Sequence, residues 1–190
     1  NAAAVGEGWL GAGRGLTDFI FVALGTGIGT GLWLGGRLHR GANSLAGEAA
    51  FFPMTRDQLR AADWQHNLES IAGGRAIAAK ARELLGAHAK PQDLFDAASA
   101  GDDQAASWLR ETQEYLAMAV VDMIALLDPQ AVIFGGGVAM AQGEPFLAPV
   151  RELVHACTPV KTKIVLSELG ADAQILGAVR LALDAKMEGR

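Results

Sequence analysis

Apolar residues fall into short blocks separated by glycine, and their spacing changes along the chain. Between residues 19 and 40, an apolar run of strand length ends in alternating glycines and a second apolar run follows. Gly35-Gly36 then leads into a third short run. Strand-like runs joined by glycine turns are typical of β-hairpins. The pattern therefore predicts a hairpin and a third strand over residues 19–40.

Three-and-four spacing of apolar residues predicts helices over much of the remaining chain. We expect Asn1 to cap the first helix, Asp102 or Asp103 to cap the longest one, and Pro91 to begin another. The expected helices cover 2–7, 68–72, 75–85, a stretch from 91, a stretch from 103 to 127, 144–156 and 172–185. In the last of them, the residues expected to face the core are Ile175, Leu176, Val179 and Leu183.

The fully apolar run at 131–134 predicts a short strand that is covered on both faces, as in a parallel sheet. A further strand is expected over 163–166. Residues 51–66 show no clean period and contain Pro53, so they are expected to be irregular. The resulting order is helix, three strands, several helices, strand, helix, strand, helix. This order predicts one α/β domain over 1–190, with a mixed sheet in which the hairpin is antiparallel and the later strands are parallel.

Composition narrows the classes of function. The 190 residues are 51% hydrophobic and carry a net charge of −5 without a basic run, which gives no reason to expect nucleic-acid binding. No apolar run reaches the roughly 18 residues that span a bilayer. Cys157 is the single cysteine, so neither a disulfide framework nor a cysteine-based zinc site is expected. A cytoplasmic location follows as the expectation. Because the first residue is Asn1 and not Met, a cloning boundary, a processed product and a lost N-terminal portion all remain open.

Two glycine clusters are the candidate ligand sites. In the first, residues 25–29, glycines allow close approach of a ligand, and backbone N–H groups with the Thr26 hydroxyl can face a phosphate. A plain hairpin with a glycine bulge is the alternative. In the second, residues 135–137, glycines at the carboxyl end of a strand let a flat ligand lie against the backbone. A tight turn into a helix is the alternative there, and Met140 in the place of a third glycine argues against a dinucleotide-binding motif.

Two acidic residues are candidates for binding hydroxyl groups. Glu48 ends a loop of small residues at 41–48, and Glu69 opens the short helix at 68–72. A surface carboxylate is the ordinary fate of glutamate. The functional alternative is a carboxylate aimed into a cleft, where it accepts hydrogen bonds from a ligand.

Taken together, these motifs resemble the C-terminal lobe of sugar kinases of the ROK family (repressor, open reading frame, kinase). Residues 24–29 resemble the phosphate loop of that family, 40–48 its sugar-contact segment, and 127–129 with 133–138 its adenosine segment. The resemblance covers nearly the whole chain. It implies an actin-like, ribonuclease-H-like fold, in which two lobes close over ATP and a sugar.

The resemblance also implies roles for individual residues. ATP with Mg²⁺ would be held by the two glycine clusters, and the sugar by hydroxyl-accepting side chains. The implied nucleotide-binding residues are Gly25, Thr26, Gly27, Gly29, Gly135, Gly136 and Gly137. The implied sugar-binding residues are Asn43, Glu48 and Glu69. Residues 1–7 resemble the segment directly after the catalytic aspartate of the family, so this aspartate would lie ahead of Asn1, and the chain would hold no catalytic residue of its own. A missing N-terminal lobe and a homodimer are the implied protein partners.

One departure from the family pattern concerns zinc. Family members commonly bind zinc through a histidine and three cysteines, and here Phe51, Arg60, Ala62 and Asn67 stand at those four positions. The resemblance therefore implies a branch without zinc, and His66 is expected to be a surface residue. Because the family histidine also touches the sugar, Phe51 leaves the identity of the sugar open.

Three functions are compatible with the sequence. The first is transfer of phosphate from ATP to a glucose-like hexose or an N-acetylhexosamine. The second is sugar sensing in a transcription repressor of the same family, whose DNA-binding helices would lie upstream. The third, dinucleotide binding through 132–137, has the least support in the sequence.

Overall fold

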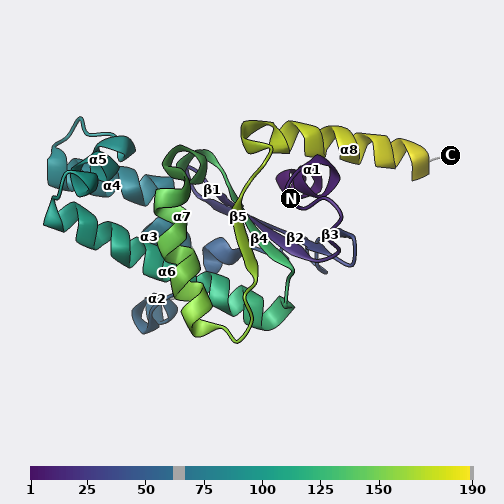
Figure 1. Cartoon of the computed structure of the whole chain (residues 1–190), viewed down its shortest axis with the longest axis horizontal. Coiled ribbons are helices and arrows are strands. Elements are labelled where there is room, and N and C mark those ends of the chain that lie inside the picture. Colours follow the sequence, from purple (N-terminus) through teal and green to yellow (C-terminus); the bar gives the residue numbers. More distant parts are fainter. Residues whose placement is uncertain (62–66, 189–190) are drawn as a thin grey trace.

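The computed structural model describes residues 1–61 and 67–188. Its five strands form one mixed sheet with the order β3-β2-β1-β4-β5 (Figure 1). They are β1 (Phe19–Leu24), β2 (Ile28–Leu34), β3 (Arg37–His39), β4 (Ala131–Gly135) and β5 (Lys163–Leu166). The β1–β2 and β2–β3 pairs are antiparallel, whereas β4 is parallel to both β1 and β5. The predicted hairpin, third strand and parallel later strands are confirmed; β4 is buried at every position, whereas β5 is an edge strand that is only partly buried.

Helices cover both faces of the sheet. They are α1 (Ala2–Leu10), α2 (Arg56–Ala61), α3 (Leu68–Ala72), α4 (Gly74–Leu85), α5 (Pro91–Ser99), α6 (Asp103–Leu127), α7 (Gly137–Cys157) and α8 (Ala173–Glu188), with short 3-10 turns η1 (Ala49–Phe51) and η2 (Gly170–Asp172). On β1, Ile20 and Val22 face the large core under α3–α7, while Phe19 and Phe21 face a smaller core under α1 and α8. This alternation explains why the central strands are apolar at every position.

Several predicted boundaries are wrong. Residues 56–61 form α2 within the stretch expected to be irregular, and residues 62–66 lie outside the described part of the chain. Helix α1 extends to Leu10, and the Asn1 side chain makes no capping hydrogen bond. By contrast, Asp102 caps α6 as predicted, because its Oδ1 accepts a hydrogen bond from Ala105 N at 2.9 Å.

The inward face predicted for α8 is wrong at three of its four residues, and the fourth, Leu176, is half-buried. Ile175, Val179 and Leu183 are 66%, 46% and 45% exposed, and Met187 continues their row at 62%. The buried residues of this helix are instead Ala173 and Gly177, which pack against α1. In Figure 1, α8 runs past the sheet beside α1. A seam of small residues therefore holds α8, and its larger apolar side chains lie outside.

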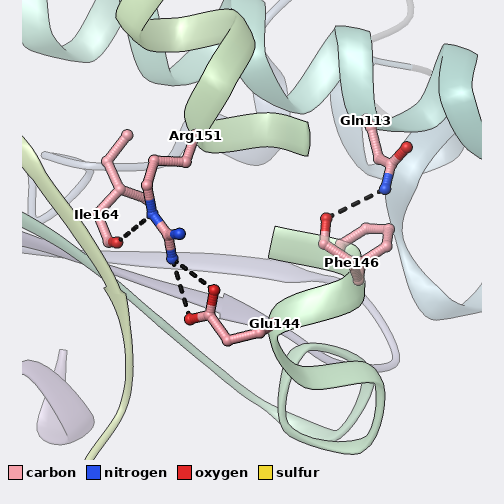
Figure 2. A network of polar contacts seen from close by, with 5 residues as sticks. All are labelled: Gln113, Glu144, Phe146, Arg151 and Ile164. Carbon is pink, nitrogen blue, oxygen red and sulfur yellow. Dashed lines mark hydrogen bonds and ion pairs between the residues drawn. The ribbon is translucent and has the colours of Figure 1, made fainter. Parts of the chain in front are cut away.

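Helix α7 begins earlier than expected and contains a kink. Gly143 has φ 60° and ψ −148°, which interrupts the helix just before the predicted start at 144. Arg151 lies across this kink: its Nη2 donates to both carboxylate oxygens of Glu144 at 2.9 Å, and its Nε donates to the Ile164 carbonyl at 2.9 Å (Figure 2). These contacts fix the second half of α7 to β5.

Thr30, on β2, is a buried residue with an unsatisfied hydroxyl. It is 5% exposed, and no hydrogen-bond partner for its Oγ1 is present among the described residues. We expect Thr30→Val to raise the free energy of unfolding by about 1 kcal/mol, because the change removes a desolvated polar group at nearly constant volume. Urea denaturation measures the difference. Thr112→Val is the matched control, since the buried Thr112 hydroxyl donates to the Trp108 carbonyl at 3.0 Å. Equal responses of the two variants would contradict the prediction.

Among the described residues 1–61 and 67–188, there is no helix of the length and apolar character needed to cross a bilayer.

Candidate functional site

The two glycine clusters meet at one edge of the sheet. We call residues 25–29 the first glycine corner and residues 135–137 the second. The corners adjoin because β1 and β4 are parallel neighbours, with Ala23 opposite Gly135. A Cβ built on Gly25 would lie 3.8 Å from Gly137 N, and one on Gly136 would lie 2.6 Å from the Leu24 carbonyl oxygen. The carboxyl ends of parallel strands in open α/β sheets are the usual place for ligands.

Three of the six predicted nucleotide-binding glycines are required by packing. A Cβ would lie 2.2 Å from Glu69 Oε2 at Gly27, 2.5 Å from the Phe21 ring at Gly135, and against the Leu24 backbone at Gly136. Gly136 also has φ +87°, where only glycine is unstrained. The glycines at these three positions are therefore explained by the fold alone.

The other three glycines have room for a side chain. Gly137 has no atom within 4 Å of its built Cβ, and the nearest atoms at Gly25 and Gly29 lie at 3.8 and 3.9 Å, which is ordinary contact distance. None of them has a positive φ. Packing within the described part of the chain therefore does not explain glycine at these positions.

Two helices begin at the glycine corners. The start of α4 is occupied by protein: Gly74 N donates to the Gly25 carbonyl at 2.8 Å, and Arg75 N donates to the Thr26 carbonyl at 2.9 Å. The start of α7 follows Gly136, whose carbonyl accepts the first intrahelical bond from Met140 N at 3.0 Å. The first N–H groups of a helix attract anions. The start of α4 is therefore hydrogen-bonded to the first glycine corner. The start of α7 places helix N–H groups at the second glycine corner.

Glu69 lies at the first glycine corner. Its Oε2 accepts a hydrogen bond from Ile28 N at 2.9 Å, and its carboxylate packs on Gly27. The side chain is half-buried and comes from the first turn of α3. The sequence predicts Glu69 as a sugar ligand, and the structure brings it into contact with the predicted phosphate loop.

Glu48 and Asn43 lie on the loop beside β2. Glu48 is half-buried and Asn43 is exposed. Gly47 packs on β2, where its Cβ would lie 3.3 Å from the Thr30 carbonyl oxygen. The start of α1 packs on the same strand, since a Cβ on Gly31 would lie 3.3 Å from Asn1 N. Burial lowers the pKa of the Asn1 amino group, the Glu48 carboxylate opposes that change, and Arg40 adds to it.

The segments that carry the zinc ligands in the family are joined here by hydrogen bonds. Asn67 Nδ2 donates to the Phe51 carbonyl at 2.6 Å, and Leu68 N donates to the Phe52 carbonyl at 3.0 Å. Asn67 is 6% exposed. Arg60 lies at the end of α2, while Ala62 and His66 lie outside the described residues, so the surface position expected for His66 is not described.

Sequence reasoning missed Glu7, which is 0% exposed. Its carboxylate accepts hydrogen bonds from Ala12 N at 2.7 Å, from Leu169 N at 3.2 Å and from the Ser167 hydroxyl. Ser167 in turn lies against the second glycine corner, 3.3 Å from a Cβ built on Gly135. A single acid within the otherwise apolar α1 sequence is the signal that could have identified this residue.

Comparison with known proteins finds related enzymes over most of this chain. The bifunctional enzyme NanE/NanK of Brucella suis biovar 1 is 40% identical over 183 residues, which is 96% of this chain and 33% of that protein. An N-acetylmannosamine kinase of Escherichia coli O127:H6 is 34% identical over 179 residues, which is 90% of this chain and 59% of that protein. The chain therefore spans between one third and about three fifths of the length of these two relatives.

A solved structure shares the fold. The ROK family glucokinase from Streptomyces griseus, in complex with glucose and AMPPNP, is 31% identical with a TM-score of 0.80, over 95% of this chain and 65% of that one. The predicted fold class, a mixed α/β sheet of the actin-like type flanked by helices, is confirmed. The ROK family model matches residues 1–185, and the chain belongs to the ROK family.

Proposed function

We propose that the intact protein is an ATP-dependent sugar kinase, and that residues 1–190 form its C-terminal lobe as one domain. The observation that carries the proposal is the meeting of two glycine corners at one sheet edge, with Glu69 in contact with the first. The similarity to an N-acetylmannosamine kinase and to a ROK family glucokinase supports a hexose or N-acetylhexosamine as the phosphate acceptor.

The proposed reaction depends on positioning and charge stabilisation more than on covalent chemistry. Backbone N–H groups of the first corner and the Thr26 hydroxyl hold the phosphates of ATP, which arrives with its Mg²⁺. The adenosine lies against the second corner, where Gly137 leaves space. Asn43, Glu48 and Glu69 bind the sugar hydroxyls, so that one hydroxyl is held in line with the γ-phosphate.

The general base is proposed to lie just before Asn1, as an aspartate that takes the proton of the attacking hydroxyl. The place of Asn1 supports this, because Asn1 and the loop that carries Glu48 both pack on β2: a Cβ on Gly31 would lie 3.3 Å from Asn1 N, and one on Gly47 would lie 3.3 Å from the Thr30 carbonyl oxygen. The 190-residue chain alone is accordingly proposed to be inactive.

We further propose that the protein needs no zinc. Support comes from the hydrogen bond between Asn67 Nδ2 and the Phe51 carbonyl, because it joins two segments that a zinc ion would otherwise hold together. The donor set also fits zinc poorly, since phenylalanine and arginine are not zinc ligands.

The remaining proposals concern partners and location. The exposed row on α8 fits an N-terminal lobe, and the relatives are long enough to contain one. We propose a homodimer in the cytoplasm, without nucleic-acid or membrane partners for this segment, on the basis of the family resemblance and the acidic net charge.

The direct test is turnover by the intact protein. Incubated with ATP and Mg²⁺, the protein is expected to phosphorylate at least one of glucose, mannose, N-acetylglucosamine and N-acetylmannosamine. A coupled assay for ADP measures the turnover. If no sugar is turned over but one of them binds tightly, the proposed function becomes that of a sugar-sensing regulator. Absence of both turnover and binding would overturn the proposal.

Gly137→Ala isolates the role of the second corner. Because the added methyl group meets no atom of residues 1–61 and 67–188, the free energy of unfolding should stay within about 1 kcal/mol of the original value. The Kd for AMPPNP, measured by calorimetry on the intact protein, should rise about tenfold, since the methyl occupies the space proposed for adenosine. Gly25→Ala tests the first corner in the same way. Unchanged Kd values for both stable variants would contradict the assignment.

A further inference from the structure

Glu69 makes a contact with the protein backbone that binding a sugar would not require. Its Oε2 accepts the hydrogen bond from Ile28 N at 2.9 Å, and this N–H stands at the point where the first glycine corner passes into β2. Strand β3 pairs only with residues Leu32–Leu34 of β2. Glu69 thus provides an acceptor on a stretch of β2 that the third strand does not cover.

The contact between Glu69 and Ile28 is flanked on both sides by glycines, Gly27 and Gly73. A Cβ on Gly27 would lie 2.2 Å from Glu69 Oε2 and 2.7 Å from its Cδ, so only glycine lets the carboxylate lie flat on the corner. On the other side, a Cβ on Gly73 would lie 3.2 Å from Glu69 Cγ and 3.4 Å from the Gly27 Cα. Glu69 is therefore packed between the corner and the α3–α4 junction.

The same junction is attached to the corner by its backbone. Gly74 N and Arg75 N donate to the Gly25 and Thr26 carbonyls at 2.8 and 2.9 Å. These bonds fix the first half of the corner, and the Glu69 bond fixes the second half. Without Glu69, the hydrogen bonds that residues 27–29 keep to other described residues lie within the hairpin.

We propose that Glu69 is a positioning residue for the first glycine corner, which sets the affinity for nucleotide before any sugar is bound. One carboxylate oxygen holds Ile28 N, and the other is available to a hydroxyl. This inference rests on the proposed function, because it takes the first corner to be the phosphate site. It adds that one acid serves both ligands.

Glu69→Ala and Glu48→Ala form the matched pair for the test. Glu48 lies on the loop that follows β3 and packs beside β2, and within residues 1–61 and 67–188 no hydrogen bond joins it to the first corner, so it should affect the binding of sugar alone. In the intact protein without sugar, Glu69→Ala should raise the Kd for AMPPNP about tenfold, whereas Glu48→Ala should leave it within about twofold. Glu69→Gln should stay within about threefold, because its amide oxygen still accepts from Ile28 N.

Amide hydrogen exchange of residues 24–31, followed without ligand, provides a readout independent of nucleotide. Exchange should quicken in Glu69→Ala and stay unchanged in Glu48→Ala. If exchange is unchanged in both, or if it quickens while the AMPPNP affinity of Glu69→Ala stays within about twofold, the inference is overturned. If the unmodified protein binds neither AMPPNP nor sugar, the proposed function fails, and this inference about nucleotide affinity fails with it. A protein that binds both ligands but shows equal effects for the two alanine variants overturns the inference alone.

Discussion

Replacing Gly177 with valine is expected to separate α8 from α1. A Cβ at this position would lie 1.7 Å from the Ala2 carbonyl oxygen and 2.9 Å from Gly6 N, and neither backbone atom can move without shifting the whole of α1. Gly6 faces the same seam, since its Cβ would lie 2.2 Å from the Ala173 carbonyl oxygen. Overpacking against the α1 backbone should lower the free energy of unfolding by about 4 kcal/mol or more.

Urea denaturation followed by circular dichroism measures this loss. Limited proteolysis should show early cleavage within α8, because α1 supplies most of its contacts. The matched control is Ala178→Val, which introduces the same β-branched residue at the neighbouring exposed position and should cost below about 1 kcal/mol. Similar losses for the two variants would show that the helices do not meet at Gly177.

Removing the Glu7 carboxylate is expected to have the second largest effect. Glu7→Ala leaves the donors at Ala12 N, Leu169 N and the Ser167 hydroxyl without their acceptor in a fully buried site. Hydrogen bonds to charged groups contribute about 1.5–3 kcal/mol each, and their losses overlap, so we expect a decrease of about 4 kcal/mol in the free energy of unfolding. Glu7→Gln keeps one acceptor oxygen and should lose about half as much.

A double-mutant cycle with Ser167→Ala tests the origin of that effect. Because the Ser167 hydroxyl donates to Glu7 and accepts from Gly170 N at 2.8 Å, the two changes should be strongly coupled and their effects should not add. Additive losses in urea denaturation would argue that Glu7 acts through something other than this contact.

The sequence predicted those elements whose signal is local. The hairpin from Phe19 to Leu34 and the buried strand at Ala131 follow from short apolar runs and glycine turns, and the structure contains both. The meeting of the two glycine corners was implied only by the family resemblance, since it depends on β1 and β4 being parallel neighbours. Thr26, Gly135 and Glu48 were chosen from their motifs, and their roles stay predictions.

Features that could not be predicted depend on contacts between distant residues. The α8 sequence shows an apolar row at Ile175, Val179 and Leu183, yet Gly177 is buried, because only a residue without a side chain lets two helix backbones approach so closely. Likewise, nothing near Glu69 in the sequence indicates that its carboxylate accepts from Ile28 N, 41 residues away. In both cases a group contacts the backbone of a segment that is distant in the sequence, and the spacing of apolar residues carries no information about such contacts.

The short β3 has a further consequence for association between chains. Since β3 pairs only with the second half of β2, residues 28–31 would form a bare strand edge if nothing else covered them. Uncovered strand edges recruit other strands and promote aggregation. The negatively charged Glu69 and the loop beside β2 occupy this stretch. The groups proposed to bind a sugar therefore also occupy the part of β2 at which a strand from another chain could add.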